Sequence, residues 1–238
     1  MQEVGFIMKK TILMVCMLVM MLCATVSAKE ISPQWVKDIE AAKNATQMVV
    51  VAGIGETTAW ISMHEKDANG DWQQIMTTPG FIGKNGLGKT KEGDAMTPIG
   101  IFHFNKAFGI KKNPGCAFEY TKVNENLYWS GDPNYKYNEL VDIRDYPNLN
   151  KEDSEHLIDY PLYYDYGLNI NYNEEGTAGK GSAIFLHCFG PFKPYTGGCV
   201  AIPEDKMLFV MKNVKKDCVV VIDYLKNLSP QTFKQLGL

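Results

Sequence analysis

Arginine is almost absent from this chain of 238 residues. Of the 24 basic residues, 23 are lysine, and Arg144 is the only arginine. A bidentate guanidinium clamp on a carboxylate or phosphate is therefore restricted to one position. The formal net charge of −3 also lacks the basic excess that is typical of nucleic-acid-binding proteins. We therefore expect no nucleic-acid partner.

Metal-binding spacings are missing as well. No C-x-x-C or H-x-x-x-H pair occurs, although such pairs are typical of zinc sites, and we expect neither a metal nor another cofactor. Repeats and coiled-coil heptads are also absent. With 45% hydrophobic and 21% charged residues, the composition is typical of a globular protein and excludes a wholly disordered chain. Nothing in the sequence indicates an oligomer, so we expect a monomer.

A long apolar run occurs at the N-terminus, where residues 1–28 are expected to form a signal peptide. A basic pair, Lys9 and Lys10, precedes an apolar segment at 11–23, and small residues favour cleavage after Ala28. The apolar segment is shorter than the about 20 residues that a transmembrane helix needs. We therefore expect an exported protein.

The rest of the chain alternates strand patterns with loop-rich stretches. Asn69-Gly70 lies between two strand-like runs and is a strong signal for a hairpin turn. A helix is predicted at 203–214, with acidic residues first and lysines last. Strands outnumber helices, so we predict a mainly β fold with a few helices. The predicted strands are 47–52, 58–65, 72–76, 97–104, 182–188 and 218–223.

The expected boundaries follow from these patterns. A lead-in at 29–46 holds a helix that starts at Ser32 and Pro33. One main domain covers 47–223 and contains a loop-rich insertion at about 111–168. The C-terminal tail is 224–238.

A nucleotide-binding motif occurs at 83–90 without its structural context. Gly83, Gly88, Lys89 and Thr90 satisfy G-x-x-x-x-G-K-[ST]. That loop needs a following helix whose N-terminus faces the phosphate. Glycine and proline follow here instead, so no helix is predicted and we expect no nucleotide partner.

The residues around Cys199 carry the elements of nucleophilic catalysis. A cysteine nucleophile needs a base that removes its proton and donors that hold the oxyanion. His187, at the end of an apolar strand, can supply the base, and Gly197 and Gly198 allow a tight turn that directs backbone N–H groups into one pocket. A helix that starts at Pro203 would lower the thiol pKa and make Cys199 reactive near neutral pH.

Two other interpretations of the cysteines remain open from the residues alone. Export permits disulfides, and Cys199 could pair with Cys188 or Cys218. His187, Cys188 and Cys199 could instead be three zinc ligands, although neighbouring residues of a strand face opposite sides. Cys188 is also expected as a small core residue, and the state of Cys116 is open.

Short sequence blocks accompany His187 and Cys199 in order along the chain. They are Gly-Lys-Asn-Gly at 83–86, Glu-Gly-Asp at 92–94, Thr-Pro-x-Gly-x-Phe at 97–102, Gly-Ser-Ala-Ile-Phe-Leu at 181–186, His187, and Thr196-x-Gly198-Cys199. This arrangement resembles the L,D-transpeptidase (YkuD-type) catalytic domain over roughly 47–223. Several blocks in order are far more specific than a lone Gly-Cys pair.

The resemblance implies a β-sandwich-type catalytic fold and an exported cysteine acyltransferase that cross-links or remodels peptidoglycan stem peptides. The location implied is the cell wall, the periplasm or the outside of the cell. Cys199 would be the nucleophile that forms a thioester, and His187 the general base. The Cys188 carbonyl would orient the imidazole, and the N–H groups of Gly198 and Cys199 would hold the oxyanion.

Alternatives to the transferase remain. The same thioester could react with water, which would give an L,D-carboxypeptidase or amidase, and the domain could also be a non-catalytic wall-binding one. Two positions depart from the family pattern, since Gly197 stands where many members have histidine and Ala201 where many have arginine or asparagine. Neither is the nucleophile or the base, so we expect catalysis to survive, whereas donor and acceptor preference stays open.

Other polar and aromatic residues are assigned with their alternatives. Thr196 and His156 could line the substrate groove. His103 is expected on the surface or packed in a strand, and His64, beside the hairpin, is expected to be solvated. Aromatic residues of the insertion could cradle a glycan or a peptide, or could serve only in loop packing. They are Tyr128, Trp129, Tyr135, Tyr137, Tyr160, Tyr163, Tyr164 and Tyr166.

Overall fold

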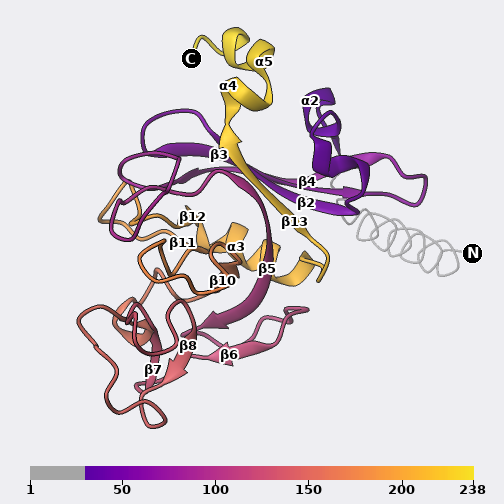
Figure 1. The fold of residues 1–238 in the computed structure, drawn as a ribbon. Coiled ribbons are helices and arrows are strands. Elements are labelled where there is room, and N and C mark those ends of the chain that lie inside the picture. Colours follow the sequence, from indigo (N-terminus) through magenta and orange to yellow (C-terminus); the bar gives the residue numbers. More distant parts are fainter. Residues whose placement is uncertain (1–29) are drawn as a thin grey trace, which may run out of the picture. The chain divides into compact units, whose positions relative to one another are not determined.

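The computed structural model describes residues 30–238, and the signal peptide expected at 1–28 lies outside the described residues. The described chain is mainly β with a few short helices, which confirms the predicted fold class (Figure 1). None of its helices combines the length and the apolar character that crossing a bilayer requires.

Ten strands form one sheet that closes on itself. The order is β1-β4-β12-β11-β10-β5-β13-β2-β3, and β6 pairs with β5. Because β4 pairs with both β12 and β3, the strands make a closed circuit with an inner and an outer face. The strands are β1 (Glu30–Ile31), β2 (Gln47–Gly53), β3 (Thr58–Lys66), β4 (Trp72–Phe81), β5 (Gly100–Gly109), β6 (Tyr120–Lys122), β10 (Gly167–Ile170), β11 (Phe185–Cys188), β12 (Val200–Ile202) and β13 (Val219–Tyr224).

The insertion between β6 and β10 folds around a small sheet of its own, in the order β8-β7-β9. Its strands are β7 (Leu127–Trp129), β8 (Leu140–Asp142) and β9 (Glu155–His156). Turns make up most of the remainder, as the sequence predicted. The helices of the described chain are α2 (Gln34–Lys37), α3 (Glu204–Asn213), α4 (Leu225–Leu228), α5 (Pro230–Gln235) and the 3-10 helices η1 (Glu40–Lys43) and η2 (Leu157–Asp159).

The β3–β4 hairpin forms at the predicted turn. Gly70 adopts a positive φ of 87°, and the Asp67 carboxylate accepts hydrogen bonds from two backbone N–H groups of the turn, at 2.9 and 3.0 Å. The second strand is longer than predicted, because β4 continues to Phe81 and pairs there with Ala201 of β12. This extension closes the sheet.

The inner face of the sheet holds the main hydrophobic core. Helix α3 covers part of it, since Met207, Val210 and Met211 are buried in this core and the helix contacts β11 and β4. Acidic residues begin this helix and a lysine ends it, as the helix dipole favours and the sequence predicted. Strand residues of this core include Val49, Ile61, Phe104, Leu168, Leu186, Ile202 and Val220.

Two segments cover the outer face. The lead-in covers β2 and β13, where Val36 and Ala42 pack against Val50. The insertion covers β5 and β11, where Trp129 packs against Phe108 and Phe185 and where Cys199 lies in the same cluster. The candidate nucleophile is therefore placed between the outer face of the sheet and the insertion.

The lead-in is not the single helix that the sequence predicted from Ser32 and Pro33. Only α2 and η1 form, and Pro33 stands before the first helical residue. Ser32 contacts the sheet instead, because its N–H donates a hydrogen bond to the carbonyl of Trp72 in β4 (2.9 Å). The helical path breaks at Ile39, whose ψ of 131° is not helical.

His64 is buried, whereas the sequence predicted a solvated residue. It pairs with Met48 on the outer face and lies under the lead-in, and its ring nitrogens hydrogen-bond to Ser32 Oγ (2.8 Å) and Ser62 Oγ (2.7 Å). Burial lowers the pKa of His64 to about 4. The prediction was wrong because the covering segment is distant in sequence from the hairpin.

Candidate active site

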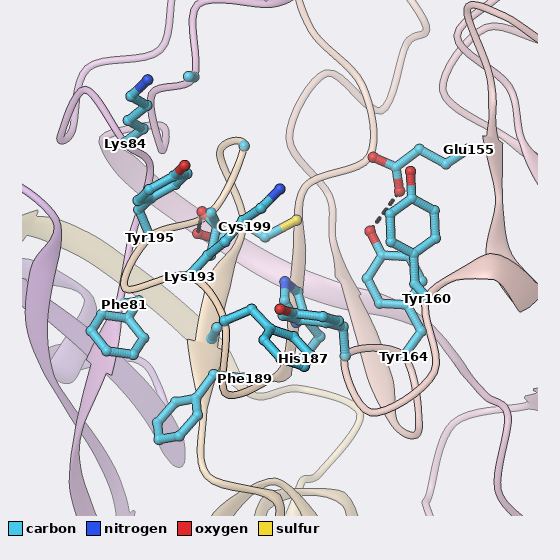
Figure 2. A pocket seen from close by; sticks show the side chains of 16 residues that line it. Phe81, Lys84, Glu155, Tyr160, Tyr164, His187, Phe189, Lys193, Tyr195 and Cys199 are labelled. Atoms are coloured by element: carbon cyan, nitrogen blue, oxygen red, sulfur yellow. Dashed lines mark hydrogen bonds between the residues drawn. The ribbon is translucent and has the colours of Figure 1, made fainter.

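A cavity of about 430 Å³ opens beside the outer face of β11 and β12, and Cys199 and His187 both line it (Figure 2). Seven of the sixteen described residues that line it are phenylalanine or tyrosine, two are lysine, and one carries a carboxylate. Other residues of the wall include Phe81, Ala95, Tyr160, Tyr163, Phe189, Tyr195, Thr196 and Gly197.

Strand register brings Cys199 and His187 to one face. β11 and β12 run parallel, with Leu186 opposite Val200 and His187 opposite Ala201. Side chains alternate along a strand, so His187, Ala201 and Cys199 point outward while Leu186 and Val200 point into the core. The pairing of two short strands thus places a thiol and an imidazole in the same cavity.

The His187 ring is held in one tautomer. Its Nδ1 lies 2.6 Å from the Cys188 carbonyl oxygen, which can only accept a hydrogen bond, so Nδ1 carries the hydrogen. The rings of Tyr163 and Tyr164 stand edge-on to the imidazole. Burial lowers the pKa of His187 to about 4. A neutral imidazole with its lone pair on Nε2 is the form that a general base requires.

The Cys199 side chain is almost fully buried and hydrogen-bonded to the backbone. Sγ donates to the Ala183 carbonyl (3.1 Å) and accepts from the Phe185 N–H (3.3 Å). Burial is the main cause that raises the pKa of this thiol, and the nearby Glu155 carboxylate adds to it. The thiol is therefore protonated near neutral pH.

The predicted effect of the α3 N-terminus on Cys199 is wrong. Strand β12 stands between the cysteine and Glu204, the first residue of the helix. The influence of a helix end fades within about one turn, so a strand of this length removes the thiol from it. Burial then dominates, and it moves the thiol pKa in the opposite direction.

The turn before Cys199 is fixed by two threonine hydroxyls. Thr196 Oγ1 donates to the Cys199 carbonyl (2.6 Å), and Thr97 Oγ1 donates to the same oxygen (3.2 Å). Gly198 adopts a φ of +147°, and its N–H donates to Thr196 Oγ1 (3.1 Å). This bond occupies one of the two N–H groups that the sequence assigned to the oxyanion.

The loop at 83–97 supports this turn and has no feature of a phosphate loop. The residues after Thr90 form bends and turns, not a helix. Lys89 donates to Asp94 (2.9 Å), and both side chains are more than nine-tenths buried. Thr97 ends the loop, and its backbone N–H and carbonyl form hydrogen bonds to other residues of the loop. Strand β5 therefore begins at Gly100, later than the predicted 97.

Of the two residues predicted to line the substrate groove, only one lines the cavity. Thr196 lines the cavity. His156 does not, because its ring stacks on Tyr128 and hydrogen-bonds to Asp159 (2.9 Å) and to the Glu125 carbonyl (2.9 Å). Alternation along β9 turns the side chain of residue 156 away from the cavity and that of residue 155 toward it.

Glu155 is the cavity residue that the sequence did not reveal. Its carboxylate accepts a hydrogen bond from the Tyr164 hydroxyl (2.5 Å), and burial raises its pKa to about 7. A carboxylate beside a histidine in a loop-rich segment carries no periodic signal. Only the pairing of β9 with β7 brings it to the cavity that Cys199 lines.

The aromatic residues of the insertion divide between the two roles considered for them. Tyr160, Tyr163 and Tyr164 line the cavity. The others do not line it: Trp129 packs in the core, and the Tyr137 hydroxyl donates to Glu92 (2.5 Å).

The alternative roles of the cysteines are not realised. Cys116, Cys188, Cys199 and Cys218 are all free thiols. Cys188 and Cys218 face the inner core, whereas Cys199 faces outward, so neither disulfide considered for Cys199 forms. The same geometry separates the Cys188 sulfur from His187 and excludes the three-ligand zinc arrangement.

Comparison with known proteins identifies the family. A family model described as the L,D-transpeptidase catalytic domain (YkuD) matches residues 59–222, more than half of the chain. The chain belongs to this family. The family is one of cysteine-dependent transpeptidases that typically act on the cell wall. No curated protein matches the chain.

Solved structures that match the chain include two at low identity. The helical cell shape determining protein Pgp2 from Campylobacter jejuni is 14% identical with a TM-score of 0.41, and the match covers 80% of this chain and 54% of that one. An L,D-transpeptidase from Stackebrandtia nassauensis is 13% identical with a TM-score of 0.33, and the match covers 84% and 61%. This L,D-transpeptidase-family chain therefore spans between half and two thirds of their length.

Proposed function

We propose that this protein is an exported L,D-transpeptidase that transfers an acyl group between peptidoglycan stem peptides through a thioester on Cys199. The observation that carries the proposal is the shared cavity of Cys199 and His187, with Nδ1 of the histidine bound to the Cys188 carbonyl. Membership of the family supports the same reaction class.

In the first half-reaction, Nε2 of His187 accepts the proton of Cys199 Sγ, and the sulfur attacks the carbonyl that joins the L-centre of a diamino acid to D-alanine. Burial favours the neutral form of both groups, so proton transfer accompanies the attack rather than preceding it. The C–S bond forms, the C–N bond breaks, and His187 gives the proton to the leaving amine of D-alanine.

The oxyanion of the tetrahedral intermediate needs donors beside Cys199. We assign this role to the Cys199 N–H, joined by the Gly198 N–H once the substrate oxygen replaces Thr196 Oγ1 as its acceptor. Thr196 and Thr97 hold the Cys199 carbonyl and so keep this turn in place.

In the second half-reaction, an amine of a neighbouring stem attacks the thioester. The C–N bond forms, the C–S bond breaks, and His187 passes a proton from nitrogen to the departing sulfur. The product is a 3→3 cross-link. If water attacks instead, the product is a shortened stem, as in an L,D-carboxypeptidase.

Incubation with defined muropeptides, followed by mass spectrometry, tests the proposal. A cross-linked dimer from the wild-type protein and none from Cys199→Ala is the expected result. A trimmed monomer alone would assign the protein as a hydrolase, and unchanged muropeptides would favour a wall-binding domain without activity.

Export is proposed from residues 1–28, whose basic pair, apolar segment and small residues resemble a signal peptide. Fusion of these residues to a reporter that is active only outside the cytoplasm should give signal. Replacement of the apolar segment by polar residues should abolish it.

A further inference from the structure

Glu155 places a carboxylate at one end of the cavity that contains Cys199. One oxygen, Oε2, accepts the hydrogen bond from Tyr164, while Oε1 has no hydrogen-bond partner within residues 30–238 (Figure 2). Glu155 is the only acidic residue among those that line the cavity. The reaction steps assigned to His187 and Cys199 leave this group without a role.

Charge is divided along the cavity. Lys84 lies at the end where Tyr195 lies, with Nζ 5.7 Å from the centre of the Tyr195 ring, and Glu155 lies at the opposite end, with Cys199 between them (Figure 2). Such an arrangement complements a substrate pair that carries carboxylate on one side of the reacting carbonyl and ammonium on the other.

The surroundings of Glu155 suit an ammonium group. Tyr160 and Tyr164 pack together with ring centroids 4.9 Å apart, and both line the cavity at this end. Aromatic faces and a carboxylate attract the same cation. Burial raises the pKa of Glu155 to about 7, so the carboxylate is a stronger base than an exposed one near neutral pH.

We propose that Glu155 binds the ammonium group of the acceptor stem peptide and accepts its proton before the amine attacks the thioester. The inference rests on the proposed function and assigns the acceptor side of the cavity. A protonated amine has no lone pair, so transfer requires a group that removes one proton, a task separate from that of His187.

The protons balance as follows. The acceptor ammonium gives one proton to the Glu155 carboxylate, which becomes a carboxylic acid. The neutral amine then attacks the thioester carbon, the C–S bond breaks, and His187 moves the second proton from nitrogen to Sγ. Glu155 loses its proton to solvent, which restores the resting enzyme.

Two small nucleophiles of matched size test this role. Ethylamine is protonated near neutral pH, whereas methoxyamine is mostly neutral and needs no base to free its lone pair. The acyl-enzyme is formed with a donor stem peptide, either nucleophile is added in excess, and the decay of the thioester is followed by intact mass. Glu155→Gln keeps an oxygen that can accept from Tyr164, so its fold should be preserved.

We expect Glu155→Gln to slow the reaction with ethylamine, and with the acceptor stem, at least tenfold. The reaction with methoxyamine and the rate of thioester formation should change less than threefold. Asp159→Asn is the control, because it removes a carboxylate of the same segment that faces His156 rather than the cavity. It should behave as the wild type with both nucleophiles.

Two results would overturn the assignment of Glu155. One is equal loss with both nucleophiles, which indicates a structural effect, and the other is no loss with ethylamine. Absence of any thioester in the wild type would contradict the proposed function itself, so the two failures are distinguishable.

Discussion

At the scale of single residues, burial sets the protonation of the proposed reacting pair, His187 and Cys199. It lowers the pKa of His187 to about 4 and raises that of the Cys199 thiol. Near neutral pH the site therefore rests as imidazole and thiol rather than as an ion pair. In the proposed mechanism, a substrate carbonyl in the cavity makes proton transfer from Cys199 to His187 favourable, because the sulfur forms a bond to carbon as it loses its proton.

His187→Gln should reduce turnover of muropeptides by at least about two orders of magnitude, since it removes the proposed base. His103→Gln is the matched control, because His103 is exposed on β5 and does not line the cavity. Both variants should keep the wild-type near-ultraviolet circular dichroism. Similar losses in both would show that another group is the base.

Alkylation by iodoacetamide should label Cys199 slowly at pH 7 and faster as the pH rises, because the thiolate is the reactive species and burial disfavours it. Peptide mapping after timed exposure measures the rate for each cysteine. A rapid, pH-independent reaction at Cys199 between pH 6 and 8 would indicate an ion pair at rest.

At the scale of elements, the loop at 83–97 fixes the turn that carries Cys199, the proposed nucleophile. The Asp94 carboxylate accepts hydrogen bonds from Lys89 and from three backbone N–H groups, which lower its pKa to about 2 against the effect of burial. Thr97, three residues later, then reaches the Cys199 carbonyl. The hydrogen bonds that hold this loop thus also hold the turn before Cys199 in position.

Asp94→Ala should lower the free energy of unfolding by about 3–5 kcal/mol, because it leaves Lys89 as an unpaired buried charge. Urea denaturation measures the loss. The double variant Lys89→Met, Asp94→Leu leaves no charge alone and should recover part of the stability. A single variant as stable as the wild type would contradict the role given to the pair.

At the scale of the whole molecule, buried ionisable groups make stability depend on pH. His64 and His187 have folded pKa values of about 4 against 6.5 unfolded. As the pH falls, these histidines therefore bind protons in the unfolded chain before they do so in the folded one. The contribution of the two histidines to stability is full above pH 6.5 and is lost as the pH falls toward 4. Glu155, raised from 4.5 to about 7, opposes this trend, since its folded form gains protons first.

Two histidines outweigh one carboxylate in this balance. Each group shifts stability by roughly 3 kcal/mol, so the protein should lose about 3 kcal/mol between pH 7 and pH 4. Glu155→Gln removes the opposing contribution of the carboxylate, so the free energy of unfolding should fall further between pH 7 and pH 4. Urea unfolding at both pH values measures this difference. Equal stability of the wild type at pH 7 and pH 4 would show that the histidines are not buried as described.

The sequence by itself determined features that depend on neighbours along the chain. Asn69-Gly70 defined the hairpin, the acidic start and basic end defined α3, and His187 with Cys199 could be recognised from short blocks. Turn geometry, helix dipoles and strand alternation depend on residues that are close in sequence, so their patterns can be recognised without the tertiary structure.

Only the tertiary structure decided the environment of these residues. The lead-in buries His64, the strand β12 separates Cys199 from α3, and β9 turns Glu155 rather than His156 into the cavity. Burial comes from segments that are distant in sequence, and burial is what controls the pKa values of the reacting groups. The identity of the proposed reacting groups could thus be predicted from local sequence, whereas their protonation depends on the fold.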